Sequence, residues 1–341
     1  MTLSVFFSVI VSLLVLSIVI LIHEIGHFSI ARALGFKIEE FSVGFGPRLF
    51  KKSRGDTEYS LRILPFGGFV RFLGEDELSH DKRAFNNQAG WKRALVLFAG
   101  SFMNIFFALL LAALVLFSYG DYFPVPVIGQ VVEESPAAQV GLEVGDRIIA
   151  VNGMDVKDYE EVYQRIQESL DKDIALTVLR DEDKLVFEMK PYYDEETQSN
   201  RIGIVFAQEK MRFSFGDSIR FSVQWTVAII REMVSYLGRL FFSGQGINDL
   251  MGPVGTIGLI GQAARQGMEM VLRLSILISI NLGVINLLPF PALDGGRLLF
   301  LAIEGVRGKP LSQEKEDLIH FAGFVVLILL MVLITYQDFT R

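Results

Sequence analysis

Long apolar runs alternate with charged stretches along this chain. Four of the runs, at residues 1–35, 94–118, 268–297 and 317–337, are long enough to form helices that cross a membrane. A helix rises 1.5 Å per residue, so about 20 apolar residues cover the hydrocarbon core of a bilayer. The pattern therefore predicts a polytopic α-helical membrane protein with four transmembrane helices.

The first apolar run is longer than one crossing requires. From Leu3 to Leu34 a helix would extend about 48 Å, against about 30 Å for the hydrocarbon core. Its last turns therefore lie close to the second membrane face. The run begins without the basic residues of a signal peptide, so we expect a retained span.

Basic residues set the expected orientation of the spans. They are dense between the first two spans and sparse at the N-terminus, so the positive-inside rule makes residues 36–93 cytoplasmic. With four crossings, both termini and residues 121–208 fall outside the cytoplasm, and the loop 298–316 falls inside it. The end of the first span therefore lies near the cytoplasmic face.

A metal-binding pattern lies in these last turns of the first span. His23, Glu24 and His27 form an H-E-x-x-H sequence. Histidines four residues apart lie about 6 Å apart on one helix face and can hold one metal ion, with the glutamate as a general base. Ionisable groups inside an apolar span are costly and usually mark a functional site. The alternative is a helix end whose polar side chains face water.

Composition limits the ligands that remain. The chain has no cysteine and only four histidines, so any metal must be held by histidine, aspartate or glutamate. Hydrophobic residues make up 51% of the chain, as expected for a membrane protein. The net charge of −7 argues against a nucleic-acid binder.

The strongest candidate for a third ligand is Asp294. It lies in the segment Asn286–Arg297, where prolines and glycines exclude a regular helix. Broken backbone at membrane depth is tolerated only inside protein or against a cavity, and a buried carboxylate there needs a cation. The weaker candidates are His80 in a charged loop, His320 at the start of the last span, and Glu304 beyond the break.

Residues 36–73 differ from the apolar runs on either side. Short strand-like runs are separated by turns at Gly44–Pro47, Ser53–Asp56 and Pro65–Gly68, which predicts a small antiparallel sheet. Strand edges are not tolerated in lipid, so we expect a membrane re-entrant β-loop at the interface or beside water, where an edge strand could pair with an extended peptide. The candidate residues for that contact are Phe69, Val70 and Arg71. The alternative is a plain connector, continuous with the charged cytoplasmic segment 74–93.

Residues 121–208 form a mostly acidic stretch between the second and third spans. The segment Ser135–Gly153, with its turn glycines, the apolar strand Ile148–Val151 and an Asn-Gly turn, resembles the PDZ family. The resemblance implies an extracytoplasmic α+β domain with a helix over Tyr159–Ser169. PDZ domains bind an extended peptide or a C-terminus by strand addition. An inert spacer is the alternative.

Residues 213–243 place apolar and polar positions at helical spacing. This pattern favours an amphipathic interfacial helix that lies on the membrane surface over a fifth span. The sequence Gly252–Gly255, with its proline and two glycines, is expected to break the chain before the third span.

Taken together, the motifs resemble the site-2 protease family of intramembrane zinc metalloproteases, and within it the bacterial RseP/RasP type. They are H-E-x-x-H in the first span, one PDZ-like domain, and N-x-x-P-x-P-x-L-D-G-G near the third span. The resemblance implies that Zn²⁺ is the cofactor, bound by His23, His27 and Asp294. It also implies that Glu24 is the general base.

The resemblance further implies substrate contacts through Asn286 and through Gly44 and Gly46 of the β-loop. Two features depart from the family pattern. Ser101 replaces a proline in the sequence Ala99–Asn104, which leaves the local helix geometry open. There is also room for one PDZ domain, whereas enterobacterial relatives carry two.

The function implied by this resemblance is regulated intramembrane proteolysis in the bacterial inner membrane. The expected substrates are single-pass membrane proteins that have already been trimmed outside, such as anti-sigma factors and signal-peptide remnants. One alternative is a non-catalytic, PDZ-bearing membrane scaffold with a vestigial metal site. A zinc transporter fits less well, because the other spans offer few histidines or carboxylates for an ion pathway.

Overall fold

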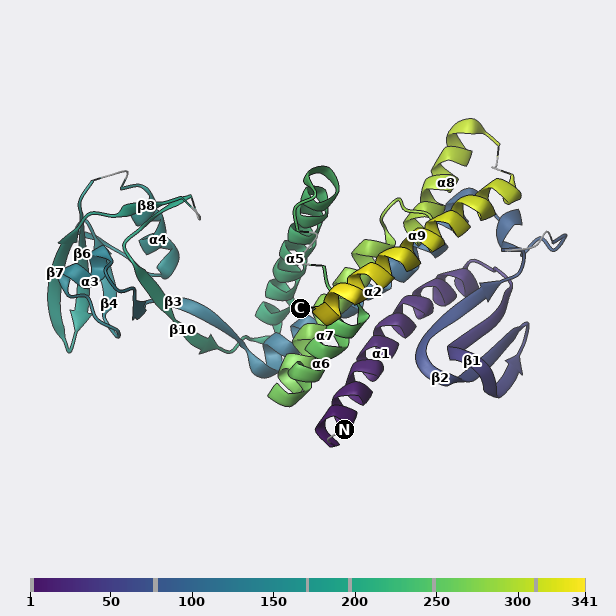
Figure 1. Cartoon of the computed structure of the whole chain (residues 1–341), viewed down its shortest axis with the longest axis horizontal. Helices are drawn as coiled ribbons and strands as arrows, with labels where there is room; N and C mark the ends of the chain where they lie inside the picture. The colour runs from purple at the N-terminus through teal and green to yellow at the C-terminus, as the bar shows by residue number, and fades with distance from the viewer. Residues whose placement is uncertain are drawn as a thin grey trace. The chain divides into compact units, whose positions relative to one another are not determined.

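The computed structural model describes residues 3–75, 79–169, 172–195, 198–246, 250–309 and 312–340. The chain divides into two compact units (Figure 1). The first combines Met1–Ser118 with Ser214–Arg341 and is mainly helical, whereas the second, Tyr119–Phe213, is built on strands.

Four helices of the first unit are long and apolar enough to cross a membrane, among the residues that the structure describes. They are α1 (Leu3–Ala33), α2 (Gly90–Tyr119), α7 (Met268–Asn286) and α9 (Gln313–Thr340). Large apolar side chains on α1, α2 and α9 are exposed, as expected where lipid surrounds the helices. The four apolar runs are therefore helices, and each is a candidate membrane span.

Small polar side chains connect α1 to α6 (Pro253–Gln266). The Ser12 hydroxyl lies 3.1 Å from the Ile257 carbonyl oxygen, and a side chain on Gly261 would meet Ser8. Small residues let helices approach closely, which is how helices associate in lipid. The close contact places α6 directly against the first span.

The break expected at Gly252–Gly255 is instead the start of α6. Pro253 occupies the first turn, where its missing amide proton costs nothing. The Asp338 carboxylate on α9 accepts hydrogen bonds from the backbone amides of Gly252 and Gly255 at 3.1 and 2.9 Å. An anion at a helix N-terminus is favourable, so α9 stabilises this helix start.

Residues 36–73 form two long strands, β1 (Ile38–Arg54) and β2 (Thr57–Phe72), rather than several short ones. The strands pass through the predicted turns at Gly44–Pro47 and Pro65–Gly68 because glycines there adopt positive φ, for example +86° at Gly44 and +81° at Gly67. The predicted turn at Ser53–Asp56 joins the two strands. The curved pairing places Phe41 opposite both Tyr59 and Val70. The first half of β1 therefore lies between two segments of β2.

A buried carboxylate holds this hairpin together. Glu40 is 3% exposed and accepts hydrogen bonds from Ser60, Arg62 and Arg48 at 2.6 to 2.8 Å. Burial would raise the pKa of Glu40, but these hydrogen bonds and the arginine charges lower it to about 2. The network keeps the curved strands in one register.

The segments around the third and fourth spans contain two further helices. α5 (Phe215–Ser243) begins at the Ser214 cap and ends at Gly244, whose φ is +66°. α8 (Asp294–Arg307) occupies part of the expected third span and of the loop 298–316. The third span itself ends at Asn286, because the proline-containing segment that follows cannot continue the helix.

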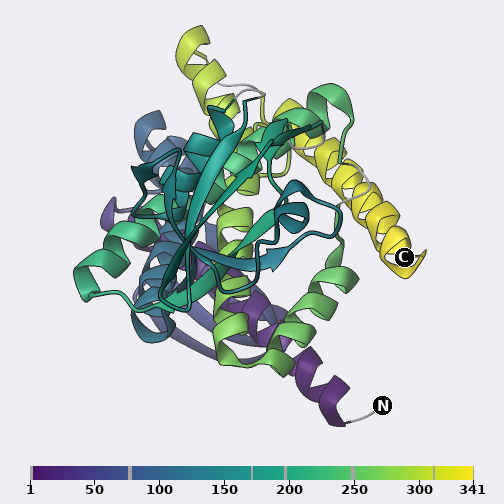
Figure 2. The same ribbon diagram turned by 90° about the vertical axis from the view of Figure 1, so that its left-hand side faces the viewer.

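The second unit is a six-stranded sheet in the order β10-β3-β4-β6-β7, with β5 paired to β4. The two views of the ribbon show this sheet (Figures 1 and 2). The helix α4 packs against β3, β4 and β9, and buried apolar side chains form the core of the unit. Asp146 is 1% exposed and pairs with the Arg180 guanidinium at 2.7 Å, which ties β4 to β6. These α+β elements fit the PDZ domain that the sequence resembles.

The remaining bounds are β3 (Asp121–Val131), α3 (Pro136–Val140), β4 (Arg147–Val151), β5 (Met154–Asp155), α4 (Tyr159–Gln167), β6 (Ile174–Arg180), β7 (Asp183–Met189), β8 (Tyr192–Asp194), β9 (Ser199–Arg201) and β10 (Ile204–Met211). In the first unit, one 3₁₀ turn, η1 (Phe85–Asn87), precedes α2.

Candidate metal centre

The two histidines of the H-E-x-x-H sequence point the same way from α1. His23 and His27 are 6% and 7% exposed, and their Nε2 atoms lie 3.0 Å apart. A helix turns once in 3.6 residues, so this spacing places both rings on one face. Both rings direct their Nε2 atoms at the same point.

Asp294 reaches this point from an irregular loop. The chain leaves α7 at Asn286, turns through Ala292 with φ +74°, and places Asp294 as the first residue of α8. Side chains on Gly295 and Gly296 would clash with the carbonyl groups of Leu288 and Phe290. The double glycine therefore lets the loop fold back tightly against the helix that it starts.

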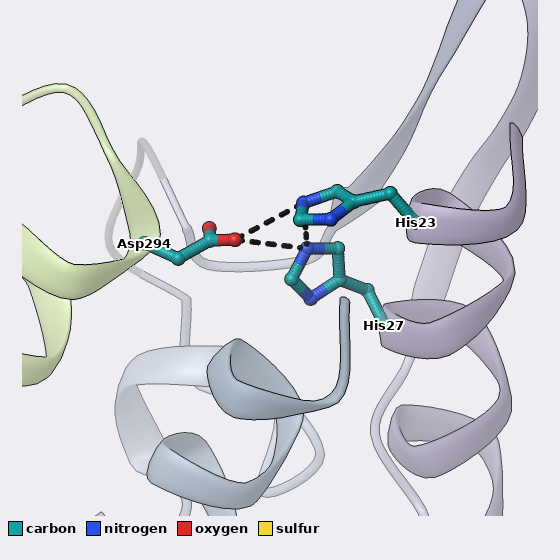
Figure 3. A group of neighbouring side chains, drawn as sticks. All are labelled: His23, His27 and Asp294. Carbon is teal, nitrogen blue, oxygen red and sulfur yellow. Dashed lines mark hydrogen bonds and ion pairs between the residues drawn. The ribbon is translucent and has the colours of Figure 1, made fainter. Parts of the chain in front are cut away.

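These three side chains form a triangle of ligand atoms (Figure 3). Asp294 Oδ2 lies 3.1 Å from His23 Nε2 and 3.3 Å from His27 Nε2. A tetrahedral Zn²⁺ with ligands at about 2.0–2.1 Å separates its ligand atoms by about 3.3 Å. The donor set and its spacing therefore fit three of the four positions around this ion.

The ring of His27 is held in the tautomer that a metal requires. Its Nδ1 lies 2.8 Å from the carbonyl oxygen of Val96 on α2, and only a protonated Nδ1 can donate to that oxygen. The lone pair of neutral His27 is then on Nε2, which faces Asp294. An α2 backbone carbonyl thus orients the ligand.

Asn104 of α2 is the neighbour of the other histidine. Its side-chain Nδ2 lies 3.4 Å from His23 Nδ1, and its Oδ1 has no hydrogen-bond partner among the described residues. Asn104 is fully buried, and a 180° rotation of its amide group would let Oδ1 accept a hydrogen bond from a protonated His23 Nδ1. That arrangement satisfies both groups and leaves His23 Nε2 free to bind a metal.

Two glycines allow α1 and α2 to approach at this depth. A side chain on Gly100 would collide with both histidine rings, and one on Gly26 would collide with the Ala99 carbonyl group. α2 remains continuous through Ser101, where the family has a proline. The close crossing of the two helices therefore encloses the histidines.

Glu24 lies on α1 beside the metal ligands and against β2. Its carboxylate lies near the Val70 backbone amide, and its Cγ is near Gly68. The glutamate thus stands between the histidine pair and the strand segment that was predicted to hold peptide. Asn286 also reaches the site, with its Nδ2 3.4 Å from His23 Nε2.

The other predicted substrate residues lie within the β-loop. Gly44 and Gly46 are nearest to Leu64 of β2. The ring of Phe69 lies under two guanidinium groups, those of Arg62 at 4.9 Å and Arg71 at 5.7 Å. Of the predicted β-loop residues, Val70 is the one whose backbone amide lies near Glu24, among the residues that the structure describes.

The weaker ligand candidates have other surroundings. His80 is exposed in the loop before α2, and Glu304 pairs with Arg93 at 2.6 Å. His320 accepts a hydrogen bond from the Ala292 backbone amide at 2.9 Å. Among the described residues, the metal-ligand group near Asp294 consists of His23, His27 and Asp294.

The sequence patterns predicted no role for Asn104, and they did not indicate Gly100 as a site residue. A buried asparagine inside an apolar run was the available signal, since polar groups in a span need partners. An open cavity of about 360 Å³ also lies beside Asp294. It is lined by Ala292, Leu293, Asp294, Arg297, His320, Phe321 and Phe324.

The structure combines candidate membrane spans with a ligand group of two histidines and a carboxylate, and a glutamate lies beside this group. This combination defines the class of membrane metallohydrolases. The sequence matches peptidase family M50 over residues 11–330, nearly the whole chain. The chain belongs to this family. It is a site-2 type intramembrane zinc metalloprotease with Zn²⁺ as cofactor, a multi-pass protein of the bacterial inner membrane.

Several proteins are similar over their full length. A putative zinc metalloprotease of Clostridium perfringens is 35% identical, with 97% of this chain and 98% of that protein covered. Zinc metalloprotease RasP of Bacillus licheniformis is 29% identical, with 98% and 99% covered. The regulator of sigma-W protease RasP of Bacillus subtilis is 27% identical, with 98% of each covered.

Among solved structures, the PDZ domain of an SdrC-like protein from Listeria monocytogenes is 20% identical. The comparison covers 25% of this chain and 90% of that domain, with a TM-score of 0.23.

Proposed function

We propose that His23, His27 and Asp294 hold the catalytic Zn²⁺ and that Glu24 is the general base for hydrolysis of peptide bonds within transmembrane segments. The observation that carries this assignment is the triangle of three ligand atoms 3.0 to 3.3 Å apart, with Glu24 next to it. Two neutral imidazoles and one carboxylate are a common catalytic zinc set that leaves a position open.

When bound, Zn²⁺ supplies Lewis-acid chemistry, which polarises a carbonyl group and makes water nucleophilic near neutral pH. The Glu24 carboxylate accepts the proton of the attacking water and passes it to the leaving amine. The Val70 amide lies near this carboxylate. Proton transfer is thus assigned to a residue that lies next to the proposed ligands in the chain and in space.

Asn286 is proposed to contact the substrate. Its amide nitrogen lies 3.4 Å from His23 Nε2, so it reaches the same small volume as the three ligands. From there its N–H group can donate to the oxygen of the scissile carbonyl group, which becomes negatively charged during attack. A donor aimed at this oxygen stabilises the transition state.

The segment Phe69–Arg71 of β2 is proposed to hold the substrate as an extended strand. Glu24 lies near Gly68 and near the Val70 amide, so this part of β2 is close to the proposed general base. A transmembrane helix hides its carbonyl groups in hydrogen bonds, and it must unwind before cleavage. Pairing with β2 offers the unwound backbone new partners. Gly44 and Gly46 shape the β-loop that presents this edge.

The proposed substrates are single-pass membrane proteins already trimmed outside the cell, such as anti-sigma factors and signal-peptide remnants. The name of the Bacillus subtilis relative, a regulator of sigma-W protease, supports this class. We place the PDZ domain and both termini outside the cytoplasm and the site near the cytoplasmic face. The PDZ domain then binds a peptide or C-terminus and admits only shortened substrates, and α5 lies in the interface.

One comparison tests the catalytic assignment. The full chain and Glu24→Gln are purified in detergent and given a single-span model substrate. We expect Glu24→Gln to retain zinc and to cleave about 100-fold more slowly or worse, because the proton acceptor is lost while the ligands remain. Equal cleavage by both proteins excludes the proposal, and no cleavage by either supports the scaffold alternative.

A further inference from the structure

α9 is mostly exposed, yet it touches the loop that carries Asp294. Only 6% of its most apolar stretch is buried inside the protein. Gly323 is the one buried residue among the described residues of α9, and a side chain there would collide with Pro291. One helical turn earlier, His320 reaches the neighbouring residue Ala292. These two contacts join the last span to the ligand loop.

The contact with His320 is directional. The Ala292 backbone amide donates to His320 Nδ1 at 2.9 Å. His320 Nδ1 therefore acts as the acceptor, and the ring proton is on Nε2, 3.9 Å from Glu316 Oε1. The ring is fixed from the other side by Phe300 of α8, with centroids 5.2 Å apart and planes at 87°. His320 is thus packed as an oriented acceptor.

Ala292 is a residue whose conformation needs such support. Its φ is +74°, a left-handed conformation that a residue with a Cβ adopts at a cost. Asp294 lies two residues after Ala292 and is the first residue of α8. A change in the Ala292 backbone would therefore move the carboxylate relative to His23 and His27.

We propose that His320 is a positioning residue for the third metal ligand. By accepting a hydrogen bond from the Ala292 amide, it holds the loop so that Asp294 faces His23 and His27. This inference rests on the proposed role of Asp294 as a zinc ligand. Gly323 also supports the loop, because the absence of a side chain there lets Pro291 pack against α9. The last span thus contributes to the metal site without supplying a ligand.

The test measures Zn²⁺ affinity of the purified full chain by competition with a chromophoric chelator. His320→Phe keeps a ring against Phe300 but removes the acceptor, and we expect about tenfold weaker zinc binding, the lower end of losses seen for outer-shell partners. His320→Asn places Oδ1 where Nδ1 was, and it should restore affinity to within about threefold of the wild type. A purely structural role for the ring predicts the opposite order.

A second pair of variants addresses the same loop from Gly323. Gly323→Ala should also weaken zinc binding about tenfold, because its methyl group displaces Pro291. Gly258→Ala is the matched control on α6, where a Cβ would meet nothing within 4 Å. If His320→Phe is not obtained folded, wild-type zinc affinity in Gly323→Ala overturns the part that α9 plays in placing this loop.

The variant Asp294→Asn distinguishes a failure of the proposed ligand set from a failure of the proposed role of His320. Unchanged zinc affinity of Asp294→Asn would overturn the proposed ligand set itself. Loss of zinc in Asp294→Asn together with wild-type affinity in both His320→Phe and Gly323→Ala overturns the positioning role and leaves the ligand set intact. Loss in all three, with recovery in His320→Asn, is the result that we expect.

Discussion

At the scale of single residues, the metal centre depends on neighbours that supply no ligand. The Val96 carbonyl group fixes His27 through its Nδ1, and Asn104 is placed to do the same for His23. Such outer partners choose the tautomer and the ring direction of a metal-binding histidine. The residues of α2 therefore decide how well α1 can hold zinc.

Removal of the Asn104 side chain should weaken zinc binding without removing a ligand. We expect Asn104→Ala to lose about tenfold to a hundredfold in Zn²⁺ affinity, because His23 loses its orienting partner. Asn104→Asp, which can only accept, should recover most of that loss. Asn286→Ala is the contrasting variant: it should slow cleavage while zinc affinity, measured by chelator competition, stays near that of the wild type.

At the scale of elements, the close crossing of α1 and α2 encloses the site. Gly100 has no side chain where both histidine rings lie, and Gly26 has none where α2 passes. The β-hairpin is held separately, by the buried charge of Glu40 and its arginine partners. Packing and charge thus stabilise different parts of the first unit.

Gly100→Ala should disrupt the helix crossing. Its methyl group has to displace the histidine rings or the helix, and overpacking of this kind typically costs about 1–3 kcal/mol. We expect a lower Tm in detergent and loss of bound zinc. Gly90→Ala, at the start of the same helix, is the control, since a Cβ there meets nothing within 4 Å. Equal behaviour of the two variants would contradict the close approach.

The hairpin should loosen in acid. The pKa of Glu40 is lowered to about 2 from an ordinary value of 4.5, so its ionised form stabilises the folded hairpin. That contribution is complete above pH 4.5 and is lost as the pH falls towards 2. Amide hydrogen exchange of β1 and β2 should therefore accelerate in this window beyond its intrinsic pH dependence. Glu40→Gln should show faster exchange at neutral pH and little of this extra change.

At the scale of the whole molecule, we base the proposed arrangement in the membrane on the four candidate spans and the distribution of basic residues. The basic segment between α1 and α2 carries the β-hairpin, so hairpin and metal site should share the cytoplasmic side. The second unit lies between α2 and α5 in the sequence and should be on the opposite side. An outer domain and an inner site suit a protease that cuts after an outer trimming step.

The absence of cysteine makes this orientation directly measurable. Exposed positions can be changed singly to cysteine, with Lys52→Cys in β1, Lys184→Cys in β7 and Thr340→Cys at the end of α9. A membrane-impermeant maleimide added to spheroplasts should label Lys184→Cys and Thr340→Cys. Lys52→Cys should be labelled only after the membrane is opened. The reverse pattern would show that the orientation is inverted.

The sequence by itself determined the elements whose signals are local. Apolar length predicted the four spans, and the one-turn spacing predicted the shared face of His23 and His27, because both depend only on helix geometry. Local turn signals were less informative. They predicted several short strands, but glycines with positive φ allow two long strands there. They also predicted a break where Pro253 begins α6, and a loop in a region that α8 partly occupies.

Only the tertiary structure decided which distant residues meet the histidines. Asp294 and Asn286 were identified from a motif, but the distances that make a ligand triangle depend on how the end of α7 and the start of α8 fold back onto α1. The parts played by Asn104, Gly100 and His320 depend on contacts between segments far apart in the chain. Such contacts are set by packing, and no local pattern of residues encodes them.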